Sequence, residues 1–288
     1  MGRMDGKVVL VTGGARGQGR EHALRLAREG ADIALFDLAE NIPSVPYDLA
    51  SEEDLQQTAA EVEALGAKTI AIKGDVRKQR DLDAAVERAI AELGDLDVLV
   101  HNAGIWAMSR FWETPEEEWL DQVDVNLTAH WRAAKAVAPH FIARRSGAIV
   151  FTSSGNGLVA GENFAHYTAA KHGVIGLMKT VAIELGPYGV RANAVCPGFI
   201  DTPMNTWQGA LDMMAGGGPG SGSLEARSTN ALHMGALAGR GLVAPGAVSQ
   251  AVLFLASDEA ADVTGVALPV DAGRVVLPGF NPNPVPAQ

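Results

Sequence analysis

The chain has 288 residues, of which 47% are hydrophobic, and a formal net charge of -11 at pH 7. The acidic balance, the lack of a basic run and the lack of an apolar run long enough to span a bilayer argue against nucleic acid and membrane partners. The single cysteine, Cys196, excludes an intrachain disulfide and fits a reducing cytoplasm. One cysteine and scattered histidines also offer no set of metal ligands. The N-terminus lacks the apolar core of a signal peptide, which likewise fits the cytoplasm.

The first elements of the chain are expected to form a strand, a glycine turn, a helix and a second strand. Val8 to Val11 is an aliphatic run typical of a buried strand, and the glycine-rich turn 12–19 follows it. Residues 22–29 have helical spacing, and the run 33–36 predicts a strand that ends on Asp37. Glycines let the backbone approach a pyrophosphate, and the helix N-terminus supplies free N–H groups. The unit therefore predicts dinucleotide binding.

Asp37 and Arg16 favour different cofactors. A carboxylate at the end of the second strand suits the two hydroxyls of an adenosine ribose and repels the 2′-phosphate of NADP. A guanidinium in the glycine turn would attract that phosphate, although Arg16 also fits a solvated turn residue. Because Asp37 is expected to lie against the ribose itself, the sequence favours NAD.

Residues 38–50 form an unusually long connection, since such loops usually take about 2–6 residues. Two prolines stiffen it and lower the entropy lost when it becomes ordered. Its apolar residues are too many for a solvated loop: Ile42, Val45, Tyr47 and Leu49. We expect the loop to fold over the adenine and to slow cofactor escape. The alternative is that it only packs on the neighbouring helix.

The rest of the chain alternates helices and strands, and Ser51 with Asp54 three residues on predicts a helix N-cap. Helices are expected over 55–65, 82–93, 119–138, 167–185 and 247–256, and strands over 69–73, 96–100, 148–151, 190–195 and 266–270. This alternation predicts an α/β fold: one Rossmann-type domain over 1–288, with a doubly wound, seven-stranded parallel sheet and helices on both faces. Ligands gather at the carboxyl ends of such strands, where the chain places Gly13, Asp37, Asp75, Asn102, Ser154 and Pro197.

Two segments stand apart from this pattern. Residues 204–240 contain four methionines and the glycine run 216–222, which predicts a flexible lid over an apolar substrate. A solvent loop without a role is the alternative. The proline-rich tail 278–288 is expected to be extended. Four aromatic residues fit either an apolar substrate pocket or the core: Trp106, Phe111, Trp112 and Trp207.

Tyr167 and Lys171 are four residues apart in an expected helix, so they share one face. A free tyrosine titrates near pH ~10, and a nearby cation favours the phenolate and lowers that pKa. The pair therefore suits proton transfer at neutral pH. A surface tyrosine beside a solvated lysine is the structural alternative.

These residues together resemble the classical short-chain dehydrogenase/reductase family. The resemblance rests on the glycine turn with Thr12, on Asn102-Ala103-Gly104, and on Asn126, Ser154, Tyr167-x-x-x-Lys171 and Pro197-Gly198. It covers nearly the whole chain outside residues 204–240 and the tail. The sequence is also similar to a narrower branch, the mycofactocin-associated, carveol-dehydrogenase-like enzymes. That likeness lies in residues 15–20, the long segment after Asp37, residues 123–128 and residues 267–273, whereas the glycine-rich lid departs from the branch.

The resemblance implies a catalytic role for four residues. Ser154, or its neighbour Ser153, would hydrogen-bond the substrate oxygen, and family spacing favours Ser154. Tyr167 would remove the alcohol proton as hydride leaves for the nicotinamide. Lys171 would lower the pKa of Tyr167 and hold the nicotinamide ribose, and Asn126 would support a water linked to Lys171. The implied cofactor-binding residues are Gly13, Arg16, Gly17, Gln18, Gly19, Asp37, Leu38, Asp75, Val76, Asn102, Ala103, Gly104, Tyr167, Lys171, Pro197, Ile200 and Thr202, and no metal is implied.

The resulting hypothesis is an NAD-dependent oxidoreductase that interconverts a hydrophobic secondary alcohol, terpene- or steroid-like, and its ketone. The resemblance also implies a homotetramer, in which the helices over 114–138 and 167–185 pack against partner subunits. It further implies tightly bound NAD and, as electron acceptor, mycofactocin, a peptide-derived redox cofactor. The alternative is a non-catalytic dinucleotide-binding sensor or scaffold. Such a protein needs the glycine turn but not Ser154, Tyr167, Lys171 and Asn126 together.

Overall fold

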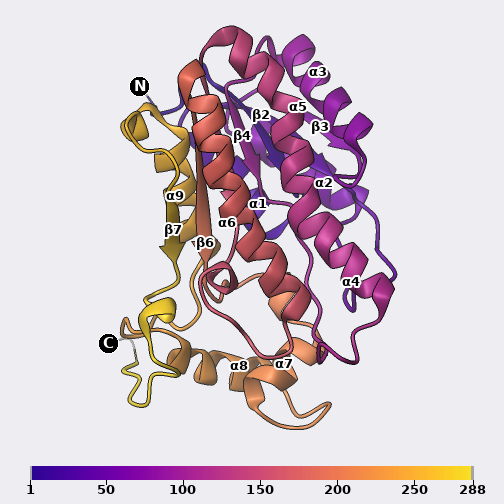
Figure 1. The fold of residues 1–288 in the computed structure, drawn as a ribbon, viewed down its shortest axis with the longest axis vertical. Coiled ribbons are helices and arrows are strands. Elements are labelled where there is room, and N and C mark those ends of the chain that lie inside the picture. The colour runs from indigo at the N-terminus through magenta and orange to yellow at the C-terminus, as the bar shows by residue number, and fades with distance from the viewer. Residues whose placement is uncertain (1, 287–288) are drawn as a thin grey trace.

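The computed structural model in Figure 1 describes residues 2–286. The strands are β1 (Val8–Thr12), β2 (Asp32–Asp37), β3 (Thr69–Lys73), β4 (Val98–His101), β5 (Gly147–Thr152), β6 (Val190–Pro197) and β7 (Ala267–Val270). The helices are α1 (Gly17–Arg28), α2 (Glu52–Glu63), α3 (Gln79–Leu93), α4 (Glu116–Val123), α5 (Ala129–Arg144), α6 (Ala165–Leu185), α7 (Gln208–Ala215), α8 (Leu224–Ala231) and α9 (Pro245–Ala256).

All the strands are parallel, in the order β3-β2-β1-β4-β5-β6-β7. The chain winds outward from β1 to β3, returns to place β4 beside β1, and winds outward in the opposite direction to β7. The expected doubly wound, seven-stranded parallel sheet is therefore confirmed. The direction reverses between β1 and β4, and in such sheets the crevice at this point is where ligands bind.

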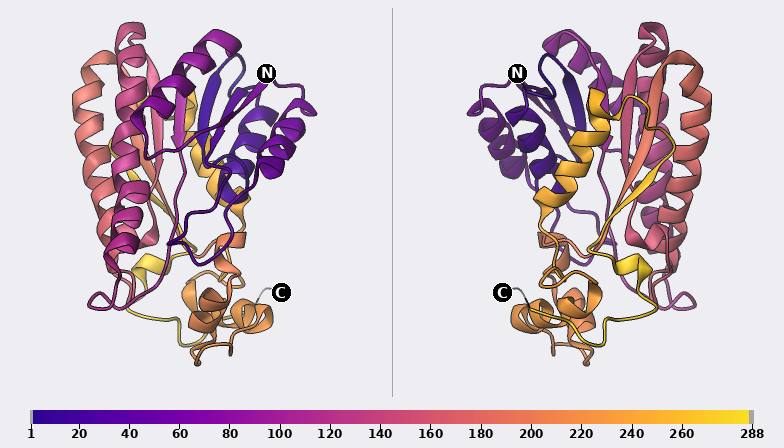
Figure 2. Two further views of the ribbon diagram at one scale, coloured as in Figure 1. Left: turned by 90° about the vertical axis from the view of Figure 1, so that its right-hand side faces the viewer. Right: turned by 90° about the vertical axis from the view of Figure 1, so that its left-hand side faces the viewer.

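Helices cover both faces of the sheet, as the side views in Figure 2 show. On one face α3, α5 and α6 bury apolar side chains such as Val86 and Val174 in a single cluster. On the other face α1, α2 and α9 bury a second cluster that includes Leu26 and Val252. Neighbouring residues of β1 contribute to opposite clusters, because successive side chains of a strand point to opposite faces.

Most elements lie where the sequence predicts them. The N-cap of α2 is confirmed as a capping box: the Ser51 Oγ accepts from the Asp54 N–H at 3.2 Å, and Asp54 accepts from the Ser51 N–H at 2.9 Å. The helix expected over 119–138 is confirmed as one continuous helical run, but it is not α-helical throughout. A π-helical turn, Asp124–Thr128, joins α4 to α5. The period of apolar residues does not signal such a turn, which is often found at functional sites.

Residues 204–240 contain two short helices, α7 and α8, which lie below the carboxyl ends of the strands (Figure 1). The Asp212 carboxylate accepts from the backbone N–H groups of Gly220 and Gly222 at 2.8 and 2.7 Å, so the glycine run folds back onto α7. Arg227 on α8 is buried and forms an ion pair with Asp201. The segment is therefore ordered into helices here, and its flexibility remains a prediction.

The tail passes beside this segment without forming a helix or strand over residues 278–286. The Asn281 N–H donates to the His233 carbonyl at 2.7 Å, and the Gly239 N–H donates to the Val285 carbonyl at 2.7 Å. Positions 287–288 of the expected tail lie outside the described residues. Over residues 2–286, none of the helices combines the length and the apolar character needed to cross a membrane.

Candidate active site

The turn between β1 and α1 brings several backbones close together. Gly13 has a φ of +64°, in the left-handed region that favours glycine. A Cβ on Gly19 would lie 1.9 Å from the Gly13 carbonyl oxygen, so a residue with a side chain would push α1 away from the turn. The first turn of α1 carries no acidic side chain. Its N–H groups and the positive end of its dipole therefore suit an anion.

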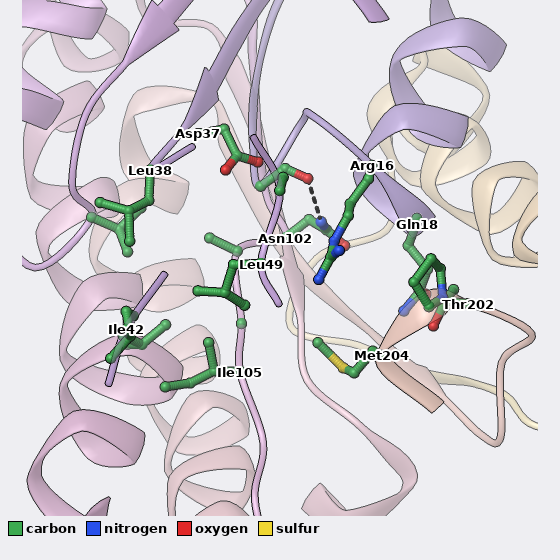
Figure 3. Close-up of a pocket in the computed structure, with 18 of the residues that line it drawn as sticks. Arg16, Gln18, Asp37, Leu38, Ile42, Leu49, Asn102, Ile105, Thr202 and Met204 are labelled. Atoms are coloured by element: carbon green, nitrogen blue, oxygen red, sulfur yellow. Dashed lines mark hydrogen bonds between the residues drawn. The ribbon is translucent and has the colours of Figure 1, made fainter. Parts of the chain in front are cut away.

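Asp37 stands at the end of β2, opposite this turn. Its carboxylate accepts from the N–H groups of Ala15 and Ala39, both at 3.0 Å. Burial raises the pKa of Asp37, while these N–H groups oppose that effect. Arg16 extends into the cleft (Figure 3), and its guanidinium donates to the Asp48 carbonyl. The guanidinium therefore binds the loop 38–50 in this structure.

Asp75, which follows β3, belongs to a chain of polar contacts. Burial opposes ionisation of Asp75, but hydrogen bonds from Arg77 outweigh it and hold the pKa below its usual range. Arg77 also pairs with Asp121 of α4 at 2.9 Å, and the Ser44 hydroxyl donates to Asp121 at 2.7 Å. The side of the cleft formed by Asp75 is thus tied through α4 to the loop 38–50.

The loop 38–50 forms one wall of the cleft. Ile42 and Val45 are buried, and Tyr47 and Leu49 pack against the same core cluster. Ile42, Tyr47 and Leu49 also line the cleft, and Figure 3 shows Ile42 and Leu49 there near Ile105. The loop therefore does more than pack on a neighbouring helix.

The cleft brings most of the predicted cofactor residues together. Those that line it are Gly13, Arg16, Gly17, Gln18, Asp37, Leu38, Asp75, Val76, Asn102, Ala103, Gly104 and Thr202. The predicted residues outside the lining are Gly19, Tyr167, Lys171, Pro197 and Ile200. The lining residues outside the predicted cofactor set are Ile42, Tyr47, Leu49, Ala50, Ile105, Val125, Pro203 and Met204. Three of them, Ile42, Tyr47 and Leu49, belong to the loop that the sequence predicts to fold over the adenine.

Tyr167 lies in the first turn of α6, next to the segment that follows β5. Burial raises the pKa of Tyr167, and a hydrogen bond with the Ser154 side chain opposes that effect. Ser153 is turned inward, and its hydroxyl donates to the Lys171 carbonyl at 2.9 Å. Of the two serines, Ser154 is therefore the one whose side chain acts on the pKa of Tyr167.

Lys171 is buried one turn further along α6. Its Nζ donates to the Thr152 carbonyl at 2.9 Å and lies 5.6 Å from the centre of the Tyr167 ring. Burial lowers the pKa of Lys171 to about 7. In this arrangement the Lys171 ammonium binds the Thr152 carbonyl, and burial and Ser154 are what shift the pKa of Tyr167, so the lowering of that pKa by Lys171 stays a prediction.

Asn126 occupies the π-helical turn and is fully buried. Its amide nitrogen donates to the Ile105 carbonyl at 2.7 Å, and its oxygen accepts from the Ile105 N–H at 3.1 Å. A Cβ on Gly104 would lie 3.0 Å from the Asn126 Oδ1 and 3.7 Å from the Lys171 Nζ. Asn126 and Lys171 therefore approach the cleft at the same glycine.

Aromatic side chains from separate segments meet near Tyr167. Trp106 packs on Phe164 and on Trp207, with ring centres 5.5 Å apart in both pairs. The backbone N–H of Trp106 donates to the Tyr47 hydroxyl at 3.1 Å, and the Tyr47 ring stacks on that of Trp207. By contrast, Phe111 and Trp112 are more than half exposed and do not belong to this cluster.

A cleft of this kind, at the reversal point of a doubly wound parallel sheet, is typical of the Rossmann-type dinucleotide-binding enzymes. The pattern of one family of these enzymes, the short chain dehydrogenases, matches residues 7–210. The chain belongs to that family. Over residues 2–286 the structure holds no cluster of metal-ligating side chains.

Individual relatives match nearly the whole chain. A (-)-trans-carveol dehydrogenase from Rhodococcus erythropolis is 42% identical, over 96% of this chain and 100% of that protein. The crystal structure of a carveol dehydrogenase from Mycobacterium avium in complex with NAD is 40% identical, with a TM-score of 0.92 and coverage of 96% of this chain and 100% of that one. A short chain dehydrogenase from Mycobacterium paratuberculosis, bound to NAD, is 38% identical, with a TM-score of 0.85, over 96% of this chain and 100% of that one.

Proposed function

We propose that this chain interconverts a hydrophobic secondary alcohol, terpene- or steroid-like, and its ketone, with Tyr167 as the acid and base. The broader statement follows from the family: the chain is an NAD-dependent alcohol dehydrogenase or ketone reductase of the short-chain type. The observation that carries the finer proposal is the meeting of Tyr167, Ser154 and Lys171 beside the cleft, under a cluster of aromatic side chains.

The residues of the cleft fit NAD. The N-terminus of α1 suits the pyrophosphate, and the Asp37 carboxylate suits the ribose hydroxyls while it disfavours a 2′-phosphate. The Gln18 Oε1 lies in the same lining and is buried without a partner among residues 2–286, as expected of a group that binds a ligand. Bound NAD would supply the hydride acceptor for alcohol oxidation.

The chain itself supplies the proton chemistry. Burial keeps Tyr167 protonated, so it is ready to donate to a ketone oxygen that the Ser154 hydroxyl holds in place. In the oxidation direction Tyr167 takes the alcohol proton. The Lys171 ammonium would then leave the Thr152 carbonyl for the phenolate, which it stabilises by charge. Asn126, held by the Ile105 backbone in the π-helical turn, would support a water linked to Lys171.

A screen of terpene and steroid alcohols with added NAD tests the substrate class. Turnover of cyclic secondary alcohols, well above that of short linear ones, is the expected result. A protein that binds NAD but turns over none of them would instead favour the alternative, a non-catalytic sensor or scaffold. The joint presence of Ser154, Tyr167, Lys171 and Asn126 supports the enzyme.

The proposal extends to tightly bound NAD that is re-oxidised in place by mycofactocin. Its support is the loop 38–50, which lines the cleft and is fastened through Ser44, Tyr47 and Asp48 to three other segments. The protein should be purified without added nucleotide and denatured, and the released NAD measured by chromatography. Near-stoichiometric NAD, with little turnover on free NAD, is expected. An empty protein that cycles freely with added NAD would contradict the proposal.

We also propose a cytoplasmic homotetramer. Large apolar side chains are exposed on α4, α5 and α6, the helices expected to meet partner subunits: Trp119, Leu120, Trp131 and Ile183. Light scattering at micromolar concentration should give four times the mass of one chain. A monomeric mass would contradict this assembly.

A further inference from the structure

Two histidines that the proposed chemistry does not use lie beside Lys171. His101 ends β4 and His130 lies in the first turn of α5, and both are fully buried. Their rings meet edge to face, with centres 4.3 Å apart and an interplanar angle of 76°. Burial and the charge of Lys171 lower the pKa of His101 to about 3, and burial, His101 and Lys171 lower that of His130. Each ring therefore carries one N–H and one bare nitrogen at neutral pH.

The contacts of Thr12 fix the tautomer of His101. The Thr12 Oγ1 accepts from the N–H groups of Asn102 and Ala103 at 3.1 and 3.2 Å. Its own proton is then free for the His101 Nδ1, which lies 3.0 Å away. A nitrogen that accepts from a hydroxyl is bare, so the proton of His101 is on Nε2.

The Thr152 carbonyl fixes the tautomer of His130. This oxygen lies 3.3 Å from the His130 Nε2, and because a carbonyl only accepts, the Nε2 carries the proton. The same oxygen accepts from the Lys171 Nζ at 2.9 Å. Two atoms are left over, the His101 Nε2–H and the bare His130 Nδ1, and both are buried without a partner among residues 2–286. They are a donor and an acceptor on touching rings.

We propose that His101 and His130 are a positioning pair for Lys171, joining Thr12 through the two rings to the carbonyl that holds the lysine. The inference rests on the catalytic role proposed for Lys171. This chain of contacts begins at the cleft, since Thr12 precedes Gly13 and its hydroxyl accepts from the backbone N–H groups of Asn102 and Ala103. The other end is the Thr152 carbonyl, which divides its lone pairs between His130 and the ammonium. The pair thereby sets how firmly Lys171 is held away from Tyr167.

Loss of the His130 side chain should raise the pKa of Lys171. The titratable groups that act on Lys171 and the pair are Tyr167 on α6, Cys196 on β6 and the two histidines themselves. Without the His130 N–H, the Thr152 carbonyl binds the ammonium alone and favours the charged form of Lys171. The alkaline limb of the kcat profile, where Lys171 loses its proton, should then move to higher pH by roughly 0.5 unit, the size of effect that one hydrogen bond produces. The kcat should fall severalfold while NAD affinity changes little.

The test uses matched variants of the whole protein. His130→Leu removes the donor, whereas His130→Gln places an amide N–H near the position of Nε2 and should restore the wild-type pH profile. His140→Leu, at a half-buried position of the same helix where the ring pairs with Asp95, controls for the loss of a histidine. Independently, two-bond ¹H–¹⁵N spectra of the imidazoles should show His101 and His130 as neutral Nε2–H tautomers from pH 5.5 to 8.5. Loss of single signals in His101→Gln and His130→Gln assigns them.

Each outcome decides the question. An Nδ1–H tautomer or a protonated ring in that pH range overturns the inference even if His130→Leu does not fold. An unmoved pH profile in folded His130→Leu also overturns it, provided that Lys171→Ala abolishes turnover. If Lys171→Ala instead retains turnover, the proposed function of Lys171 fails.

Discussion

The two walls of the cleft are held by different interactions. The wall at the strand ends is close-packed backbone, with Gly19 against Gly13, and the Thr12 hydroxyl binds the backbone that follows β4. The opposite wall, the loop 38–50, is anchored by Ile42 and Val45 in the core and otherwise held by side-chain hydrogen bonds such as that of Ser44 with Asp121. Such bonds contribute about 1 kcal/mol each, so we expect the loop to open more readily than the sheet. We expect the first wall to set cofactor affinity and the second to set the rate of release.

The largest effect should come from a change that leaves both walls intact. Tyr167→Phe keeps the ring and removes the hydroxyl, so turnover should fall at least ~10²-fold, in line with general acid–base contributions. NAD should still bind, because Tyr167 lies outside the cleft lining. Steady-state kinetics and NAD titration measure the two effects separately. Turnover near the wild-type rate would contradict the assignment of Tyr167.

A change in the wall at the strand ends should have the next largest effect, a loss of NAD affinity. Gly19→Ala places a methyl group 1.9 Å from the Gly13 carbonyl, so the turn or α1 must shift. Because misplacement of about 1 Å can cost on the order of 100-fold in function, we expect NAD to bind at least ~30-fold more weakly. Calorimetric titration measures this. Gly246→Ala, where the new methyl group meets no atom closer than 3.6 Å, is the control and should bind NAD normally.

Cofactor choice depends on the end of β2, where the two walls meet. Asp37→Ala removes the carboxylate that disfavours a 2′-phosphate, while Arg16 remains in the cleft. The ratio of NADP to NAD affinity should rise about tenfold, the change expected for one removed charge repulsion. An unchanged ratio in parallel titrations would mean that Asp37 does not lie at the ribose.

Weakening the side-chain wall should change release more than affinity. Ser44→Ala removes one hydrogen bond of the loop, so NAD should leave about fivefold faster, as expected for roughly 1 kcal/mol. Stopped-flow displacement with excess nucleotide measures the rate. Ser228→Ala, whose hydroxyl bonds only within α8, is the matched control. If both variants release NAD equally fast, Ser44 does not hold the loop.

The smallest expected effect is on the pH dependence of stability, through the packing of α1 against α9. His22 on α1 is buried against Ser249 of α9, and burial lowers its pKa to about 3. Since the unfolded histidine titrates near 6.5, its contribution to stability is complete above that pH and is lost as the pH falls toward about 3. The cost is about 1 kcal/mol per pH unit. His22→Asn should therefore lose less unfolding free energy than the wild type between pH 7 and pH 5 in denaturant titrations.

The sequence predicts the sheet and the backbone wall well, because short-range patterns determine them. The apolar runs of the strands, the glycines of the first turn and the capping box at Ser51 each act over a few residues. The π-helical turn at Asn126 is not predictable in this way, since the apolar spacing does not mark it and the Asn126 amide contacts Ile105 of another segment. The sequence also does not predict that the Lys171 ammonium binds a backbone carbonyl. The Thr152 carbonyl that binds it lies on β5, and no local spacing signals that contact.

The tail bears on how the protein should be handled in the laboratory. In Figure 1 the start of β1 and the tail residues 281–285 lie toward opposite ends of the molecule, and residues 281–285 hydrogen-bond to the segment that follows α8. A purification tag or surface anchor fused after the tail would pull on the segment that contains α7 and α8. The same attachment at the other terminus would be remote from the cleft. Kinetic comparisons among variants are therefore best made with N-terminal fusions.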